Sequence, residues 1–485
     1  MPLNSIIDHH LAPFLVPSVM ASIIYKMHRS RRSDILYQTV FIGTSISSLC
    51  GPLYLRINQK TTSRTKLVYF KALMLTVEAL SSIVAFNLTR LNLFEDTYKL
   101  PLAVRGLRPS NGSDVFRYHF FVDIVPGLLI FTQVQLSSMI KQELLDRAKR
   151  SFSLGEASIV AHLASAALAT WALVVYTNLT NAGPFMISLT TNIVLNIGLA
   201  IFFLALAPSY LFVRNRATFI RYFLIGISVV LSYFSVKILI GKSSLEPFTW
   251  LIDHIFATHQ RISLFSLWLS TLAACLSFST SWSKMVGQTN SLVRKVFHLA
   301  ICVVFISGYN QDVDFMRFAA GSMLIVMVLL EMIRAWQLWP FGDYLENICR
   351  SLRGRWDNRY LTLSQIYLLV GAFLPLWLIP IESDPSKLAI SSGLISVGVG
   401  DTAAAIVGTF FGKNELGHTG KTVEGFLGNM IAMIIFKLVW IGYNGFDENM
   451  SFLLASLCVS VVEVFTSNCD NLILPLIFML VIDLV

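Results

Sequence analysis

Charged residues are scarce in this chain. Asp, Glu, Lys and Arg make up 13% of its 485 residues, 55% of the residues are hydrophobic, and the mean hydropathy is +0.66. A soluble protein of this length would have about 25% charged residues. Apolar runs of about 17 to 25 residues, long enough to cross a bilayer, recur along the chain. The composition therefore excludes an ordinary soluble enzyme. It predicts an all-α, polytopic integral membrane protein with roughly 13–15 transmembrane helices.

The chain also lacks a cysteine framework and a recognisable leader. Its six cysteines show neither paired metal-ligand spacing nor the density of a disulfide scaffold. The first apolar run, residues 11–25, has no basic region before it, so no cleavable signal peptide is expected. The net charge is +9, but Lys and Arg lie mainly in short loops between apolar runs. Such a distribution is typical of membrane topology, and we expect no nucleic-acid partner.

We expect two regions. Residues 1–285 would form an N-terminal multi-helix membrane region, and residues 286–485 would form the functional domain. Intramembrane polar residues of the first region are scattered, so we expect them to lie near an interface or to pair with another helix. These residues are Glu78, Asp123 and Lys237. The spans expected in this region lie near 11–26, 35–55, 67–88, 118–138, 157–177, 185–212, 218–240 and 262–282.

In the second region the polar segments recur at every second loop. If each span crosses the membrane once, these segments lie on one side of it, and that side also carries nearly all the basic loop residues of this region. The positive-inside rule makes that side cytoplasmic. The segments are the Arg294–Lys295 end of a span, residues 334–360, residues 412–424 and residues 466–471. The spans between them lie near 296–307, 316–333, 364–381, 387–411, 425–442, 451–465 and 472–485.

A glycine-rich stretch stands out from this apolar background. Residues 393–428 contain nine of the 27 glycines of the chain. Gly398 and Gly400 would allow the backbone to approach a ligand closely, although glycines in membrane helices also serve tight helix packing. Asp401 follows directly. A carboxylate at this depth costs about 2.5 kcal/mol or more unless it is paired, hydrated or bound to a metal, so Asp401 is a candidate site residue.

The polar loop that follows has the chemistry of a phosphate-binding loop. It lacks the Walker A spacing, because Glu415 stands where that pattern requires glycine. Nevertheless, Gly417 and Gly420 expose backbone, Lys421 supplies a positive charge, and Thr422 can cap the helix that begins after it. A helix N-terminus of this kind attracts anions.

Acidic residues near this loop indicate a divalent cation. Glu424 would repel a phosphate unless a cation lay between them, although it could equally interact with the helix dipole. Asp470 and Asn471 could add metal or ribose contacts, or form an ordinary turn before the last span. Arg294, Lys295 and His298 could take part in the site, or anchor their helix at the membrane interface.

These motifs together resemble a known family. Residues 398–425 resemble the nucleotide-binding signature of the CTP-dependent polyprenol kinases, and residues 294–298 and 470–475 resemble two further signatures of that family. The stretch 361–377 is similar to its dolichol-phosphorylating members, except that Gln365 stands where a histidine is expected. The shorter members, which phosphorylate phytol or diacylglycerol, lack so long an N-terminal half.

The resemblance implies a multi-pass enzyme of the endoplasmic reticulum membrane whose active site faces the cytoplasm. It would transfer the γ-phosphate of CTP to dolichol, giving CDP and dolichyl phosphate, the lipid carrier for protein N-glycosylation. A divalent cation, Mg²⁺ or Ca²⁺, would be required. The candidate residues are Gly398, Gly400, Gly417, Gly420, Lys421, Thr422, Lys295, Arg294 and Asn471 for the nucleotide; Asp401, Glu424 and Asp470 for the metal; and Asp401, Lys421, Glu424 and His298 for catalysis.

Two other classes stay open at this point. Another CTP-dependent lipid enzyme would share the nucleotide and the metal, whether it is a phytol kinase, a diacylglycerol kinase or a cytidylyltransferase that makes a CDP-lipid. A polytopic transporter could also have intramembrane acids and glycine-interrupted helices. A transporter, however, would predict corresponding motifs in two halves of the chain, and the sequence has none.

Overall fold

A computed structural model describes most of the second half of the chain and parts of the first. The described residues are 18, 125–147, 151–179, 198, 226, 229–230, 232–234, 236–237, 246–286, 291–352, 361–379, 387–416, 420–440, 442, 446–466 and 470–484. Apart from residue 18, the predicted spans at 11–26, 35–55 and 67–88 lie outside the described residues, and so do Glu78 and Asp123. Lys237 is described, and its ammonium donates to Glu246 Oε1 at 2.7 Å.

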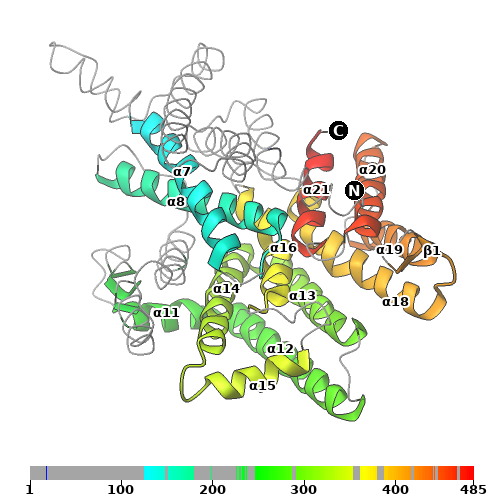
Figure 1. Ribbon diagram of the computed structural model, residues 1–485, viewed down its shortest axis with the longest axis horizontal. Coiled ribbons are helices and arrows are strands. Elements are labelled where there is room, and N and C mark those ends of the chain that lie inside the picture. The colour runs from blue at the N-terminus through cyan, green and yellow to red at the C-terminus, as the bar shows by residue number, and fades with distance from the viewer. Residues whose placement is uncertain are drawn as a thin grey trace, which may run out of the picture. The chain divides into compact units, whose positions relative to one another are not determined.

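The described residues are predominantly helical (Figure 1). Helices α7 (Val125–Arg147) and α8 (Leu154–Leu179) belong mainly to one compact unit, and all elements from α11 onward belong to another. The predicted division at 285/286 stays a prediction. The second unit contains α11 (Pro247–Phe256), α12 (His259–Val286), α13 (Ser291–Gln311), α14 (Val313–Ala335), α15 (Gly342–Leu352), α16 (Ser364–Leu378), α17 (Lys387–Ile390), the π-helix η4 (Leu394–Gly400), α18 (Asp401–Phe411), β1 (Glu415–Leu416), β2 (Lys421–Thr422), α19 (Val423–Trp440), α20 (Phe446–Phe465) and α21 (Asp470–Leu484).

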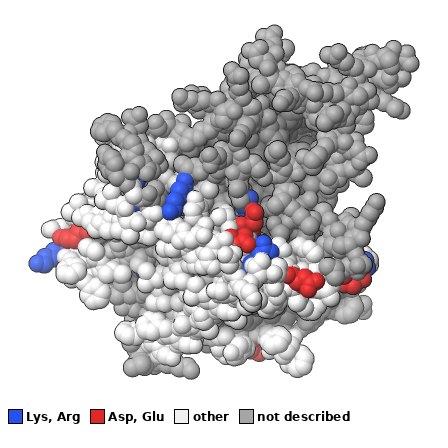
Figure 2. Space-filling model, turned by 180° about the vertical axis from the view of Figure 1, so that it is seen from behind, with Lys and Arg blue, Asp and Glu red and all other residues white. Residues whose placement is uncertain are grey.

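The helices have the length and composition of membrane spans. Among the described residues, four helical segments are long and apolar enough to cross a bilayer: His259–Trp282, Val313–Ala335, Leu394–Phe411 and Val423–Trp440. On the face drawn in Figure 2, charged side chains lie in a few separate spots among uncharged residues. The prediction of an all-α, polytopic membrane protein is confirmed. The total of 13–15 helices stays a prediction, because it includes spans outside the described part.

Contacts between helix ends show that α19 and α20 run antiparallel. Lys421, directly before α19, contacts Glu463 in the last turn of α20. At the other end of the same pair, Lys437 near the end of α19 donates to Asn449 near the start of α20. Lys421 and Glu463 therefore lie at one end of this helix pair, as the alternation of spans predicts.

The π-helix η4 continues directly into α18 and forms one apolar segment with it. The backbone N–H of Asp401 bonds to the carbonyl oxygen of Ser396, five residues earlier, which is the spacing of a π-turn. Tight packing accompanies this turn. A Cβ placed on Gly400 would lie 2.4 Å from Asn429 Oδ1 of α19, and one on Gly398 would lie 2.8 Å from Cys302 Sγ of α13. The missing side chains at these two glycines thus bring three helices together beside Asp401.

Candidate active site

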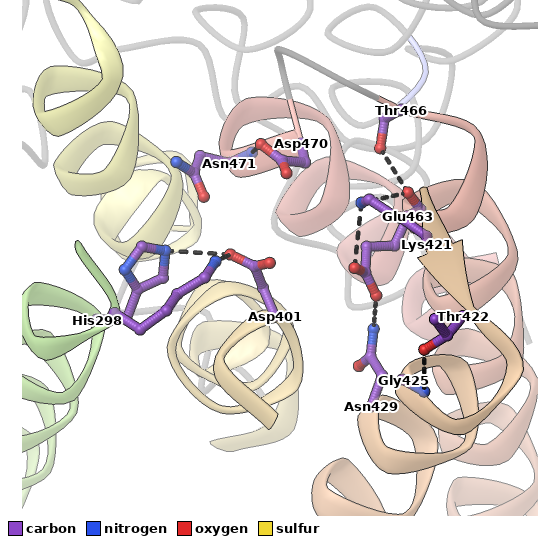
Figure 3. Close-up of polar contacts among 11 residues, drawn as sticks. His298, Asp401, Lys421, Thr422, Gly425, Asn429, Glu463, Thr466, Asp470 and Asn471 are labelled. Atoms are coloured by element: carbon purple, nitrogen blue, oxygen red, sulfur yellow. Dashed lines mark hydrogen bonds and ion pairs between the residues drawn. The ribbon is translucent and has the colours of Figure 1, made fainter. Parts of the chain in front are cut away.

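Asp401 is buried and forms the centre of a charged cluster. It is 5% exposed and lies at the junction of η4 and α18. Lys295 of α13 donates a hydrogen bond to Asp401 Oδ2. His298 Nε2 lies 3.1 Å from the same oxygen (Figure 3). Lys295 and His298 lie three residues apart, so they project from the same face of α13. The structure thus brings three sequence-predicted residues together, and the buried carboxylate is paired.

The second ring nitrogen of His298 also faces an oxygen atom. Nδ1 lies 3.3 Å from the carbonyl oxygen of Arg294, one turn earlier on α13. His298 is held in one orientation by these two contacts. The role of Arg294 in nucleotide binding stays a prediction.

Lys421 contacts a residue that sequence reasoning missed. Its ammonium donates to the carbonyl oxygen of Glu463 at 2.6 Å and to Glu463 Oε1 at 3.1 Å. Asn429 of α19 donates its amide N–H to the other carboxylate oxygen, Glu463 Oε2. Glu463 is 5% exposed and lies in an apolar run. The argument that singled out Asp401, the cost of a carboxylate inside a membrane, would have identified Glu463 as well.

The ammonium of Lys421 lies in a strongly negative environment. Burial alone would lower its pKa, but the carboxylates of Glu463, Asp470 and Asp401 together raise the pKa above the ordinary value for lysine. These three acids come from three different helices, α20, α21 and α18. Lys421 therefore stays positively charged and is electrostatically coupled to both acidic segments that the sequence pointed to.

The loop before α19 folds back as a short hairpin. Strands β1 and β2 pair antiparallel, with Leu416 opposite Lys421. Gly420 has a φ of 72°, a left-handed conformation that favours glycine. Thr422 Oγ1 accepts the backbone N–H of Gly425 at 3.1 Å, which confirms the predicted cap at the start of α19. Gly417, a predicted backbone contact to phosphate, lies outside the described residues.

Glu424 is bonded to the loop rather than to the Asp401 cluster. Its carboxylate accepts the backbone N–H groups of Lys413 at 3.1 Å and Asn414 at 3.3 Å, and the Asn414 side-chain amide at 2.8 Å. The contacts shown fix the conformation of the chain between α18 and β1. Within the described part of the chain, no three acidic, histidine or cysteine residues are grouped so that they could hold a metal ion. The metal set of Asp401, Glu424 and Asp470 stays a prediction.

Asp470 and Asn471 form the first turn of α21. Asp470 Oδ1 accepts the backbone N–H of Asn471 at 2.9 Å. Asn471 Oδ1 is buried and has no hydrogen-bond partner among the described residues. Figure 3 shows these two side chains across from Asp401, with Lys421 to one side. A buried carbonyl oxygen without a partner, next to a carboxylate, is an arrangement that suits a bound cation or a donor group of a ligand.

The described contacts of the site do not include three residues that the sequence singled out: Gly398, Gly400 and Gln365. The space beside each glycine is occupied by a neighbouring helix, so both glycines serve helix packing, and a direct role in nucleotide binding stays a prediction. Gln365, which replaces the expected histidine, lies in the first turn of α16 and is half-buried. None of the contacts described above involves its side chain.

The chain is similar to known proteins over much of its length. A family model described as "Dolichol kinase" matches residues 120–415, more than half of the chain. This match includes Lys295, His298 and Asp401 and ends before Lys421.

Individual relatives have the same description. The human protein named "Dolichol kinase" is 35% identical over 250 residues, which cover 48% of this chain and 46% of the human protein. The Arabidopsis thaliana protein "Dolichol kinase EVAN" is 31% identical, with 48% of this chain and 42% of that protein covered. The Schizosaccharomyces pombe protein "Dolichol kinase sec59" is 27% identical, with 61% and 60% covered. The chain thus spans about half the length of the curated relatives it matches. No solved structure matches it.

Proposed function

The chain belongs to the dolichol kinase family, and we propose that it transfers the γ-phosphoryl group of CTP to the terminal hydroxyl of dolichol. The products are CDP and dolichyl phosphate. In this reaction the hydroxyl oxygen forms a bond to the γ-phosphorus, the bond from that phosphorus to the β,γ-bridging oxygen breaks, and the hydroxyl proton is released. The observation that carries the proposal is the meeting of Lys295, His298 and Asp401 with Lys421 and its acidic partners in one buried region.

Phosphoryl transfer depends mainly on positioning and on neutralising charge. We assign the phosphates of CTP to Lys421 of β2 and Lys295 of α13. The capped N-terminus of α19 adds backbone N–H groups and a favourable dipole for an anion. Asn471 and Arg294 are assigned to further nucleotide contacts.

A divalent cation, Mg²⁺ or Ca²⁺, fits the oxygen-rich side of this region. Asp401, Asp470 and the unpartnered Asn471 Oδ1 offer the hard oxygen donors that such ions prefer. When bound, the ion would neutralise negative charge on the phosphates. We assign Asp401 and Asp470 to hold it. The observed contacts of Glu424 are with the loop at Lys413 and Asn414, and its place among the metal ligands stays a prediction.

The proton of the attacking hydroxyl goes to the Asp401–His298 pair. His298 Nε2 lies 3.1 Å from Asp401 Oδ2, so a proton can be shared between these two atoms. Lys295, on the same face of α13, also donates to Asp401 Oδ2 and holds the carboxylate in place. A positioned pair of this kind within hydrogen-bonding reach is the arrangement that general base catalysis requires.

We place this activity in the endoplasmic reticulum membrane with the site open to the cytoplasm, where CTP is available, and its product in protein N-glycosylation. The basic loop residues on the site's side of the spans support that orientation. The family membership supports a polyprenol as the lipid substrate.

Radioactive CTP tests the proposal directly. Purified protein in lipid bilayers is given dolichol and CTP that is labelled at either the γ- or the α-phosphate. We expect the γ-label, and not the α-label, to enter the lipid, and the transfer to stop when divalent ions are chelated. Incorporation of the α-label would indicate a cytidylyltransferase. A preference for phytol or diacylglycerol over dolichol would indicate a related kinase, and CTP-independent transport without labelling would indicate a transporter.

A further inference from the structure

Glu463 joins two elements that flank the nucleotide loop. Its carboxylate accepts from Lys421 through Oε1 and from Asn429 through Oε2, and its own carbonyl oxygen accepts from Lys421 at 2.6 Å. Thr466 Oγ1 donates to the same carbonyl oxygen at 3.2 Å. Figure 3 shows these side chains as one connected group. The Lys421 ammonium thus donates two hydrogen bonds to a single residue of another helix.

The two hydrogen bonds to Glu463 restrict the position of the Lys421 ammonium. A lysine side chain is long and flexible, and its ammonium has three N–H donors. Two of them are directed at Glu463, which fixes the position of the nitrogen. The third has no partner among the contacts the structure shows for the described residues. One N–H is therefore available to a phosphate oxygen while the other two keep the ammonium in place.

Asn429, one partner of this carboxylate, packs against the backbone next to Asp401. Asn429, which donates to Glu463 Oε2, presents its Oδ1 to Gly400, so closely that a Cβ at Gly400 would lie 2.4 Å away. Gly400 directly precedes Asp401. A chain of contacts thus runs from Lys421 through Glu463 and Asn429 to Gly400, the residue before Asp401.

We propose that Glu463 is a positioning residue for the transfer reaction, which orients the Lys421 ammonium toward the phosphates of the nucleoside triphosphate and fixes its place relative to Asp401. This inference rests on the proposed function. Glu463 need not touch the substrate, since both of its carboxylate oxygens are already bonded to protein. The alternative is an ion pair that only stabilises the packing of α19 on α20.

The test uses Glu463→Gln in the full chain and measures the kinetic constants for CTP and for dolichol separately. Gln keeps the size of the side chain but removes the charge that holds Lys421. We expect kcat/KM for CTP to fall at least tenfold while KM for dolichol stays within twofold. In a Lys421→Ala background we expect Glu463→Gln to have less than a twofold further effect, because a residue that acts through Lys421 has nothing left to position. Additive losses in the double variant, or an unchanged kcat/KM for CTP, would overturn the proposal.

A matched control removes a buried carboxylate of the same type elsewhere. Glu331 bonds Arg334 at 2.7 and 2.8 Å within α14, outside the proposed site. Glu331→Gln should lower thermal stability without changing kcat/KM for CTP. If Glu463→Gln fails to accumulate, Asn429→Ala takes its place, with an expected loss of at least threefold in kcat/KM for CTP, and no loss would count against the proposal.

Binding of labelled CTP to the wild-type protein distinguishes a failure of the proposed function from a failure of the positioning role alone. If the wild type neither binds CTP nor transfers its γ-phosphate, the proposed function fails and the positioning role fails with it. If the wild type does both and the Glu463 variants behave like it, only the positioning role is wrong.

Discussion

Lys421 places a fixed positive charge among three carboxylates, and its removal should be costly. We expect Lys421→Ala to lose about 2 to 5 kcal/mol of transition-state stabilisation, a rate loss of roughly 30-fold to several thousand-fold. The measurement is kcat/KM for CTP with purified, folded protein. Lys413→Ala, which removes an exposed lysine of the same loop, is the matched control and should have little effect. Near-normal activity of Lys421→Ala would refute the assignment.

The raised pKa of Lys421 makes a separate prediction about pH. Because the pKa in the folded protein lies above the ordinary value of 10.5, the charge and its contribution to stability are present below that value and are lost only as pH rises through the folded pKa. We therefore expect the ratio of CTP affinities between wild type and Lys421→Ala to stay constant from about pH 7 to 9. A ratio that falls toward one within this range would mean that the ammonium loses its proton there.

Asp401 has two roles that a pair of variants can separate. Asp401→Asn should abolish transfer, and it should also destabilise the protein by about 3 to 5 kcal/mol, because Lys295 then lies half-buried without its carboxylate. Adding Lys295→Met removes the unpaired charge, so the double variant should regain thermal stability but not activity. Melting temperature in detergent and transfer of the γ-label are the measurements.

The contrary outcome for Asp401 is equally definite. An Asp401→Asn protein that loses stability but keeps its activity and its dependence on divalent ions would make Asp401 a helix-packing residue. The cation would then have to be assigned to Asp470 and Asn471, and the proton to another acceptor.

At the scale of elements, the crossing of α16 and α21 positions the Asp470–Asn471 turn. A Cβ on Gly371 would lie 1.8 Å from the carbonyl oxygen of Asn471, so the two helices touch there through backbone. We expect Gly371→Ala to force α21 away, to cost about 1 to 3 kcal/mol or more in stability, and to lower activity in the protein that still folds.

Gly198→Ala is the control for this substitution. Its added Cβ would lie 3.8 Å from the nearest side-chain atom, Ile325 Cγ1, which is ordinary contact, so its melting temperature should stay near that of wild type. Equal melting temperatures for Gly371→Ala and wild type would show that the helices can separate at no cost, and that the crossing does not fix Asn471.

Most helices of the second region could be predicted from the sequence, whereas their local irregularities could not. Apolar runs mark the spans near 387–411 and 425–442, and the helices there begin and end within a few residues of these limits, the first as α17, η4 and α18. The π-turn at η4 could not be predicted, because it depends on glycine contacts with α13 and α19. The hairpin of β1 and β2 likewise depends on Glu424, whose bonds to residues 413 and 414 cannot be read from spacing.

For the whole molecule, the alternation of spans predicted that the start of α19 and the end of α20 lie at the same end, but not which atoms bond. The convergence of residues 334–360 on the same site stays a prediction. Lys295, His298 and Asp401 were candidates on chemical grounds, and the structure pairs them directly. Glu463 was not predicted as a site residue, because it stands in no motif and its partner Lys421 is 42 residues earlier. Only the antiparallel packing of α19 and α20 brings these two side chains together. Residue type was therefore enough to select candidate site residues, whereas the hydrogen-bond partner of a residue far away in the sequence could not be predicted.

The orientation of the site in the membrane gives the last prediction. Contacts place Lys421 and Glu463 at one end of the α19–α20 pair, and Lys437 and Asn449 at the other end. Single cysteines at Lys413, Ser467 and Asp447 in a cysteine-free variant can report each end to an impermeant thiol reagent in sealed microsomes.

We expect residues 413 and 467 to react and residue 447 to react only after detergent is added, because the positive-inside rule predicts that the basic loops face the cytoplasm. Reaction of 447 alone would place the site in the lumen, away from cytoplasmic CTP, and would remove the proposed donor. Opposite labelling of 413 and 467 would mean that Lys421 and Asp470 lie on different sides of the membrane. No single nucleotide could then contact both, and the site would have to be rebuilt around the Asp401 cluster alone.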